Sequence, residues 1–249
     1  MRRVFLTHLT PGTTPLTPEQ RKHLIQVLRL GDGTVLQAFD AHGATATATL
    51  RTDPPSLDIS LVSPPTDGAP RSGWDGVVAS AVPKGERADW LVEKLAELGV
   101  RQWIPLDTAR SVVLPRGEGK RLRWERIAQE AARQSHSRGV MSIGQLTPLP
   151  HLLATFAVGA SPGWFGSTTP GAIPAAGLFV FPSPPYILIG PEGGWTPEEE
   201  LAMSSAGLTA ATFSSTVLRV ETAAVVAASL ATNLSLIAPS QPHPPHLPA

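Results

Sequence analysis

The sequence predicts an α/β domain with a largely parallel sheet, preceded by a small, mostly β module. After residue 73, apolar segments alternate with amphipathic helical segments, as in strands joined by helical crossovers. Before residue 63, short segments rich in Val, Thr and Ala are separated by turn residues. Residues 63–73 contain three prolines and two glycines, which is typical of a linker. We therefore expect one domain over residues 1–70 and a second over residues 73–238.

The first domain begins with a helix signal and continues with strand signals. Thr17 is a suitable N-cap, Pro18 suits the first helical position and Gln20 completes a capping box, so a helix is expected through about Leu30. Strands are expected at residues 34–39, 45–50 and 57–62.

The second domain is expected to contain alternating strands and helices, the first helix ending at Gly99. Residues 158–185 give a weak signal, with only a strand at 178–181 indicated. The tail 239–249, with five prolines, is expected to be disordered. The expected strands are residues 77–82, 100–106, 186–189 and 209–213, and the expected helices are 86–98, 120–135, one from Thr196 to Gly207, and a long C-terminal one. Trp90, Trp103 and Trp124 are expected in the core.

Composition excludes several function classes. There is no cysteine, so disulfides and thiolate metal sites are excluded. The histidines lack metal-ligand spacing with Asp or Glu, and we expect no metal. The N-terminal apolar run is too short for a signal peptide, and residues 223–238 fall short of the ~20 apolar residues of a membrane span. We expect a cytoplasmic protein with no membrane contact.

The formal net charge is zero, but the charges are segregated. Residues 71–138 hold thirteen Lys and Arg against nine Asp and Glu, whereas residues 139–249 hold one basic residue, Arg219, and five acidic ones. The basic segment 110–138 suits RNA phosphates. A solvated helix with intrahelical Glu–Arg pairs explains it equally well.

Residues 190–194, with the sequence GPEGG, lie between a buried strand and a helix start. The carboxyl end of a parallel strand is where α/β proteins bind ligands, and glycines allow close approach to the backbone. The spacing matches neither a dinucleotide fold nor a phosphate loop. Glutamates 198–200 at the helix start would repel phosphate but tolerate a ligand carrying a sulfonium and an ammonium. An ordinary glycine turn is the alternative.

Five segments together resemble one enzyme family. They read ILIGPEGGWTPEEE (187–200), LRVETA (218–223), PKGERADWLVEKLAELG (83–99), RIAQEAARQS (126–135) and HLIQVLRL (23–30). They are similar to signature segments of the bacterial 16S ribosomal RNA (uracil-N3)-methyltransferases of the SPOUT superfamily. The resemblance spans the chain to about residue 238.

The resemblance implies a PUA-like β-barrel domain followed by a SPOUT domain with a trefoil knot. It also implies S-adenosyl-L-methionine as cofactor, a uridine of 16S ribosomal RNA in the small ribosomal subunit as substrate, and a homodimer without metal. The methyl group would pass to N3 of the uracil, which must lose its imide proton.

Site residues follow from the resemblance by position. Arg219 would stabilise the uracil anion, and Glu221 would orient Arg219 or accept the proton; an ion pair between the two that caps the last helix is the structural alternative. The expected cofactor-binding residues are Leu188, Gly190, Glu192, Gly193, Gly194, Phe213, Ser214, Val217, Leu218 and Thr222. The expected RNA-binding residues are Lys84, Arg87, Arg110, Arg123, Arg126 and Arg133.

One departure from the family pattern leaves two alternatives open. The family usually has Gly-Pro where Ser214 and Ser215 stand, which could reshape one wall of the pocket. A non-catalytic ribosome-assembly or RNA-binding factor on the same fold is therefore one alternative, and a methyltransferase acting on a different base is another. The intact sequence of residues 190–194 favours catalysis.

Overall fold

The structure of the chain is a computed structural model. It describes residues 2–41, 43–63, 74–115, 117–137, 139–156, 163–180 and 186–237. Most of the expected linker and all of the expected disordered tail lie outside these ranges. The chain forms two compact units, one of residues 1–72 with 132–140 and one of residues 73–131 with 141–249. Among the described residues, no helix combines the length and the apolar character that crossing a bilayer requires.

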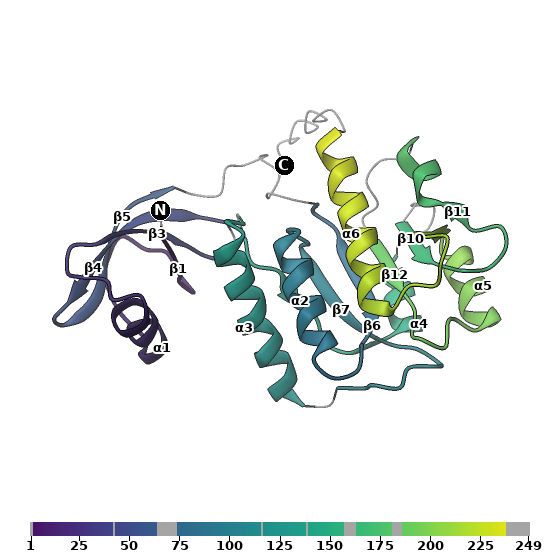
Figure 1. Cartoon of the computed structure of the whole chain (residues 1–249), viewed down its shortest axis with the longest axis horizontal. Coiled ribbons are helices and arrows are strands. Elements are labelled where there is room, and N and C mark those ends of the chain that lie inside the picture. Colours follow the sequence, from purple (N-terminus) through teal and green to yellow (C-terminus); the bar gives the residue numbers. More distant parts are fainter. Residues whose placement is uncertain are drawn as a thin grey trace, which may run out of the picture. The chain divides into compact units, whose positions relative to one another are not determined.

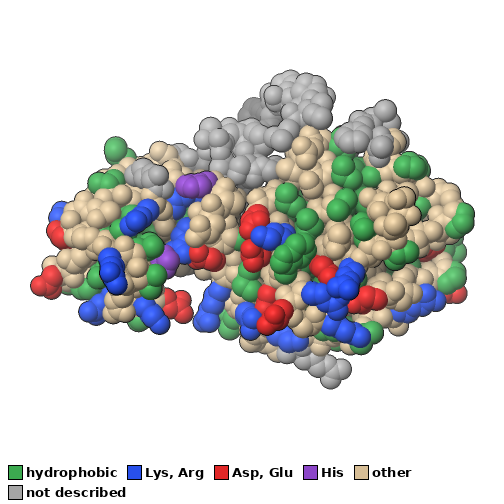
Figure 2. Space-filling view, in the orientation of Figure 1, with side chains coloured by type: hydrophobic (Ala, Val, Ile, Leu, Met, Phe, Trp, Pro, Cys, Tyr) green, Lys and Arg blue, Asp and Glu red, His purple; other side chains and the backbone are tan. Residues whose placement is uncertain are grey.

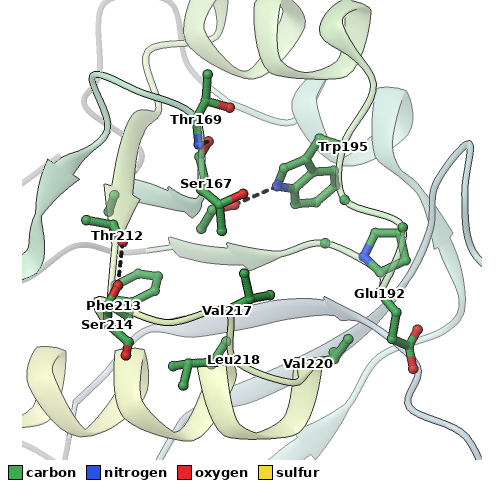
Figure 3. Close-up of a pocket in the computed structure, with 18 of the residues that line it drawn as sticks. Ser167, Thr169, Glu192, Trp195, Thr212, Phe213, Ser214, Val217, Leu218 and Val220 are labelled. Carbon is green, nitrogen blue, oxygen red and sulfur yellow. Dashed lines mark hydrogen bonds between the residues drawn. The ribbon is translucent and has the colours of Figure 1, made fainter.

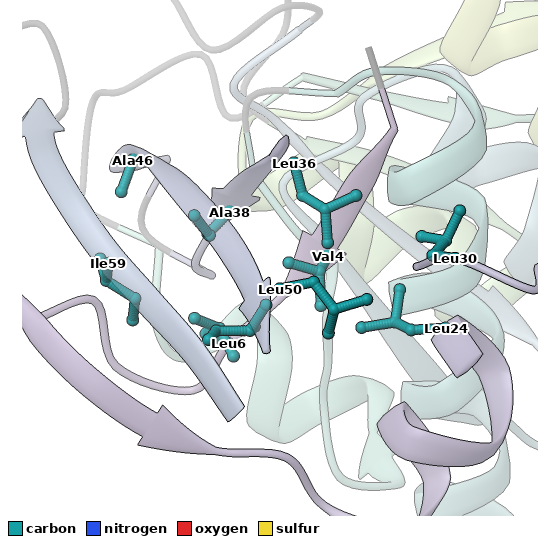
Figure 4. Packing of buried hydrophobic residues seen from close by; sticks show 11 residues of the cluster. Val4, Leu6, Leu24, Leu30, Leu36, Ala38, Ala46, Leu50 and Ile59 are labelled. Carbon is teal, nitrogen blue, oxygen red and sulfur yellow. The ribbon is translucent and has the colours of Figure 1, made fainter. Parts of the chain in front are cut away.

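The first unit is built on a sheet in the order β1-β3-β4-β5-β2, in which β1 and β3 are parallel and the other pairs antiparallel. Buried side chains of this sheet form its core together with Leu6, Leu24 and Leu30 (Figure 4). Along β4, alanines and Leu50 point inward while threonines point outward, the two-residue period of a half-buried strand. The strands are β1 (Arg3–Phe5), β2 (Gly12–Pro15), β3 (Val35–Phe39), β4 (Thr45–Thr52) and β5 (Pro55–Ser63).

The first helix differs from the expectation in its length and type. Thr17 and Gln20 form the expected capping box at the start of α1 (Pro18–Arg21). The chain then continues as a π-helix, η1 (Lys22–Val27), and ends before Leu30. The three expected strands are confirmed as β3, β4 and β5. Strands β1 and β2 were not predicted, because three or four residues give too short a pattern.

The second unit contains a parallel sheet in the order β11-β13-β10-β12-β6-β7-β8, with β9 paired to β7 (Figure 1). Helix α6 packs beside α2 and over β6 and β12, and α4 packs on α5. The strands are β6 (Val77–Ala81), β7 (Gln102–Asp107), β8 (Ser142–Ile143), β9 (Thr147–Pro148), β10 (Gly163–Gly166), β11 (Ile173–Pro174), β12 (Tyr186–Ile189) and β13 (Thr209–Thr212). The helices are α2 (Arg87–Glu97), α3 (Glu118–Gln134), α4 (Leu149–Leu153), the 3-10 helix η2 (Ala175–Val180), α5 (Pro197–Ser205) and α6 (Val220–Ile237).

The expected alternation of strands and helices in this unit is confirmed, with two corrections. The strand indicated at residues 178–181 is wrong, since residues 178–180 belong to the 3-10 helix η2 and residue 181 lies outside the described residues. Trp103 and Trp124 are buried and meet edge to face with ring centroids 4.9 Å apart. Trp90, which was expected in the core, is 43% exposed because it faces outward from α2.

Candidate functional site

A pocket of about 380 Å³ lies at the carboxyl ends of three neighbouring strands, β13, β10 and β12 (Figure 3). Because these strands are parallel, the loops that follow them meet at one edge of the sheet. The lining residues are 166–169 after β10, 190–195 after β12 and 211–214 with 216–218 around the end of β13, together with Arg110, Glu200, Val220 and Ala223.

The glycines of the 190–194 loop are required partly by packing. A Cβ on Gly190 would lie 2.9 Å from Cε2 of Trp195, whose ring is buried. The indole Nε1 of Trp195 donates to the carbonyl oxygen of Gly166 at 2.8 Å, and this bond joins the loops after β12 and β10 (Figure 3). Gly194 has φ of +69°, a left-handed conformation that favours glycine. The loop is thus a shaped wall of the pocket as well as a turn.

Arg110, which lies in the loop after β7, also lines the pocket. Its Nη1 donates to the carbonyl oxygens of Gly193 at 2.7 Å and Trp195 at 3.1 Å. The neighbouring backbone N–H of Ala109 donates to Oε1 of Glu199 at 2.8 Å. Strand β6 lies between β7 and β12, so these bonds reach over its end. Arg110 was expected to contact RNA, whereas here it holds the 190–194 loop.

Helix α5 begins at a complete capping box, as the sequence predicts, with Thr196 as N-cap and Glu199 as its partner. The pKa of Glu198 in the same turn is lowered, first by a hydrogen bond from its own backbone N–H, then by the Thr196 hydroxyl, and also by the charge of Arg110. Glu200, two residues further along the same helix, faces the pocket. Its carboxylate accepts hydrogen bonds from the hydroxyls of Ser167 at 3.0 Å and Thr169 at 3.1 Å.

The loop after β13 forms the opposite wall. Ser214 is one of its expected cofactor residues. Its hydroxyl accepts from the backbone N–H of Thr216 at 3.1 Å, and its carbonyl oxygen accepts from the hydroxyl of Thr212 at 3.1 Å. Val217 lines the pocket with 82% of its surface exposed. The Ser214-Ser215 pair therefore supports a hydrogen-bonded turn, and the pocket is present with this loop as its wall.

Arg219 and Glu221 face different surroundings. Arg219 is exposed, and within the described part of the chain it makes no ion pair. Glu221 is buried at the start of α6, with Oε1 3.5 Å from Nη1 of Arg87 on α2. Its Oε2 is buried and has no hydrogen-bond partner among the described residues. The alternative of an Arg219–Glu221 ion pair is therefore wrong, because the carboxylate pairs with Arg87.

Most of the expected cofactor residues line the pocket, namely Gly190, Glu192, Gly193, Gly194, Phe213, Ser214, Val217 and Leu218. Leu188 and Thr222 do not line it. Leu188 belongs to β12 and its side chain is fully buried in the core, and Thr222 is half-buried in the first turn of α6. Sequence reasoning missed Ser167, Thr169, Trp195 and Glu200.

The expected RNA-binding residues are spread over several elements. Lys84 is exposed before α2, and Arg87 is held by Glu221. On α3, Arg123 is 67% exposed with Nη2 2.5 Å from Oδ2 of Asp89, and Arg126 is also exposed. Arg133, near the end of the helix, is half-buried. Intrahelical pairs occur as well, since Arg121 pairs with both Glu118 and Glu125. On the face drawn in Figure 2, basic and acidic side chains are interleaved.

Comparisons with known proteins agree on one family. The family described as "RNA methyltransferase domain" matches residues 72–232. The ribosomal RNA small subunit methyltransferase E of Bacillus subtilis (strain 168) is 29% identical over 226 residues, covering 87% of this chain and 88% of its own length. The protein of the same name from Synechocystis is 28% identical over 238 residues, covering 87% of this chain and 71% of its own length.

A solved structure agrees over nearly the whole chain. It is the crystal structure of a ribosomal RNA small subunit methyltransferase E from Neisseria gonorrhoeae bound to S-adenosyl methionine. It matches with a TM-score of 0.80 and 27% identity, covering 94% of this chain and 98% of that chain.

Proposed function

Because this chain belongs to the RNA methyltransferase domain family, we propose that it methylates ribosomal RNA of the small subunit with S-adenosylmethionine as methyl donor. The observation that carries this function is the pocket between the loops after β10, β12 and β13, in a chain whose relatives are named for this reaction. The specific product that we propose is N3-methyluridine in 16S ribosomal RNA.

The pocket suits this cofactor. A cavity of about 380 Å³ falls within the range of small-molecule sites, and its walls mix backbone, apolar and polar groups. The carboxylate of Glu200 provides negative charge for a ligand with a sulfonium and an ammonium group. When bound, S-adenosylmethionine supplies an electrophilic methyl group. The 190–194 loop, held by Arg110 and Trp195, would hold it through closely approached backbone.

The substrate side of the site centres on Arg219. Methyl transfer to N3 requires loss of the imide proton, and negative charge then spreads over O2 and O4 of the uracil. A guanidinium has planar donor geometry for two such oxygens. Arg219 follows the pocket residue Leu218 directly and is exposed, so a base drawn out of its RNA context can reach it. Glu221 faces α2 and is buried, which favours a role in fixing the start of α6.

We further propose the finer architecture that the family resemblance implies. The first unit would be a PUA-like barrel that contacts RNA together with exposed arginines of α3. The loops around the pocket would belong to a trefoil knot, and two copies of the chain would form the active dimer in the cytoplasm without a metal. The agreement with the Neisseria structure over 94% of this chain supports the architecture.

The alternative of a non-catalytic RNA-binding factor needs no cofactor pocket. The persistence of that pocket with Ser214 and Ser215 in its wall favours an enzyme. The decisive experiment incubates the purified chain with radiolabelled S-adenosylmethionine and small subunits from a strain lacking this gene. We expect label in 16S ribosomal RNA and none in subunits from the parent strain, which are already methylated. Cofactor binding without transfer to subunits or to naked RNA would favour the non-catalytic factor.

A further inference from the structure

The pocket contains a fixed negative charge whose role is not explained by the fold. Glu200 lies in the first turn of α5, and its side chain lines the pocket. The hydroxyls of Ser167, which is buried, and of Thr169 both donate to Oε1. Thr169 also lies 3.3 Å from Oε2. The two hydroxyl donors fix the orientation of the carboxylate.

The charges around Glu200 leave its carboxylate available to a ligand. Arg110 is the basic residue that lines the pocket, and its Nη1 bonds to the carbonyl oxygens of Gly193 and Trp195. No ion pair to Glu200 occurs among the described residues. The two hydroxyls that hold this half-buried carboxylate are neutral, so they do not offset its negative charge, and charges interact more strongly in a pocket than in open water.

We propose that Glu200 is a specificity-determining residue that recognises a cationic group of the cofactor. This inference rests on the proposed function. S-adenosylmethionine carries two cationic groups, the sulfonium and the α-ammonium, and Glu200 would contact one of them. Ser167 and Thr169 act as positioning residues, because their hydroxyls hold the carboxylate in place.

Three ligands show which of the two cationic groups Glu200 recognises. S-adenosylmethionine has both, S-adenosylhomocysteine keeps only the ammonium, and 5′-methylthioadenosine has neither. Their affinities are measured by calorimetry for the wild-type chain and for Glu200→Gln, which keeps the shape and can still accept both hydroxyl hydrogens. Glu198→Gln is the matched control, since Glu198 lies in the same helical turn, is exposed and does not line the pocket.

We expect Glu200→Gln to weaken S-adenosylmethionine binding roughly tenfold to a hundredfold, the range for a hydrogen bond or contact with a charged group. Equal loss for S-adenosylhomocysteine identifies the ammonium, and loss confined to S-adenosylmethionine identifies the sulfonium. The affinity for 5′-methylthioadenosine stays unchanged. Thr169→Val, which keeps the charge but removes one hydroxyl, should give a smaller loss with the same ligand pattern.

Two results would overturn the inference. One is unchanged affinity of a folded Glu200→Gln chain for S-adenosylmethionine. The other is an equal loss for all three ligands, which would show that Glu200 only shapes the pocket. Either result leaves the proposed function intact as long as the wild-type chain binds S-adenosylmethionine. Failure of the wild-type chain to bind it would overturn the proposed function and, with it, the inference.

Discussion

Arg110 offers a sharp test of how the pocket is built, because two roles predict different results for one substitution. The sequence suggests an RNA contact, whereas the structure shows Nη1 bonded to the carbonyl oxygens of Gly193 and Trp195 at 2.7 and 3.1 Å. The side chain also packs on the loop, since a Cβ on Gly193 would lie 3.3 Å from Cβ and Cδ of Arg110. Arg110→Ala removes both hydrogen bonds and this packing.

The expected magnitude follows from these contacts. A hydrogen bond contributes about 0.5–1.5 kcal/mol net, and the exposure of Arg110 argues against the larger values for charged donors. Two bonds therefore order the loop by about 1–2 kcal/mol, which corresponds to a roughly five- to thirtyfold loss of cofactor affinity. Arg110→Lys should recover part of this loss, because an ammonium can still donate to one carbonyl oxygen. The free energy of global unfolding should change little, since the contacts are local.

Two assays distinguish the roles. Calorimetry with S-adenosylmethionine should show the loss, while the slope of log K against log salt for RNA binding should stay as in the wild-type chain. Arg123→Ala is the matched control, an exposed arginine that should flatten that slope by about 0.7–0.9 and leave cofactor affinity alone. If Arg110→Ala instead flattens the RNA slope and binds the cofactor normally, the loop-holding role is refuted.

Three further predictions concern the rest of the site. Gly193→Val should abolish S-adenosylmethionine binding in calorimetry while the chain stays folded by circular dichroism, because its side chain would press on Arg110; normal affinity would contradict the loop assignment. Arg219→Ala should lose ~10²–10³ in turnover in a methyl-transfer assay at unchanged cofactor affinity and melting temperature, with poor rescue by Arg219→Lys; early melting with normal turnover would indicate a structural role. Replacing Arg123, Arg126 and Arg133 together should flatten the salt dependence of RNA binding without altering cofactor affinity, and an unchanged slope would make α3 ordinary solvated surface.

The local features of the fold and site could be predicted from the sequence. Thr196 and Glu199 form the expected capping box, and the 190–194 loop lies at the expected strand end. These features depend on residues that are close together in the sequence, so the sequence pattern predicts them. Most of the helices and strands that were expected from the periodicity of apolar residues are present for the same reason.

The remaining features depend on which elements become neighbours. Ser167 meets Glu200 because β10 lies beside β12, and β10 is a four-residue strand with a weak pattern. Glu221 pairs with Arg87 because α6 packs on α2, and no local signal shows that. Arg110 looked like a phosphate ligand because charge alone cannot distinguish an RNA contact from one to backbone carbonyls.

The reaction proposed for this chain is methylation of small-subunit ribosomal RNA at N3 of a uridine. Mass spectrometry of 16S ribosomal RNA tests it most directly, comparing a strain that lacks the gene with the same strain carrying either the wild-type chain or Arg219→Ala. We expect one N3-methyluridine to be absent without the gene, to be restored by the wild-type chain and to stay strongly reduced with Arg219→Ala. An unchanged set of methylated uridines in the strain lacking the gene would contradict it.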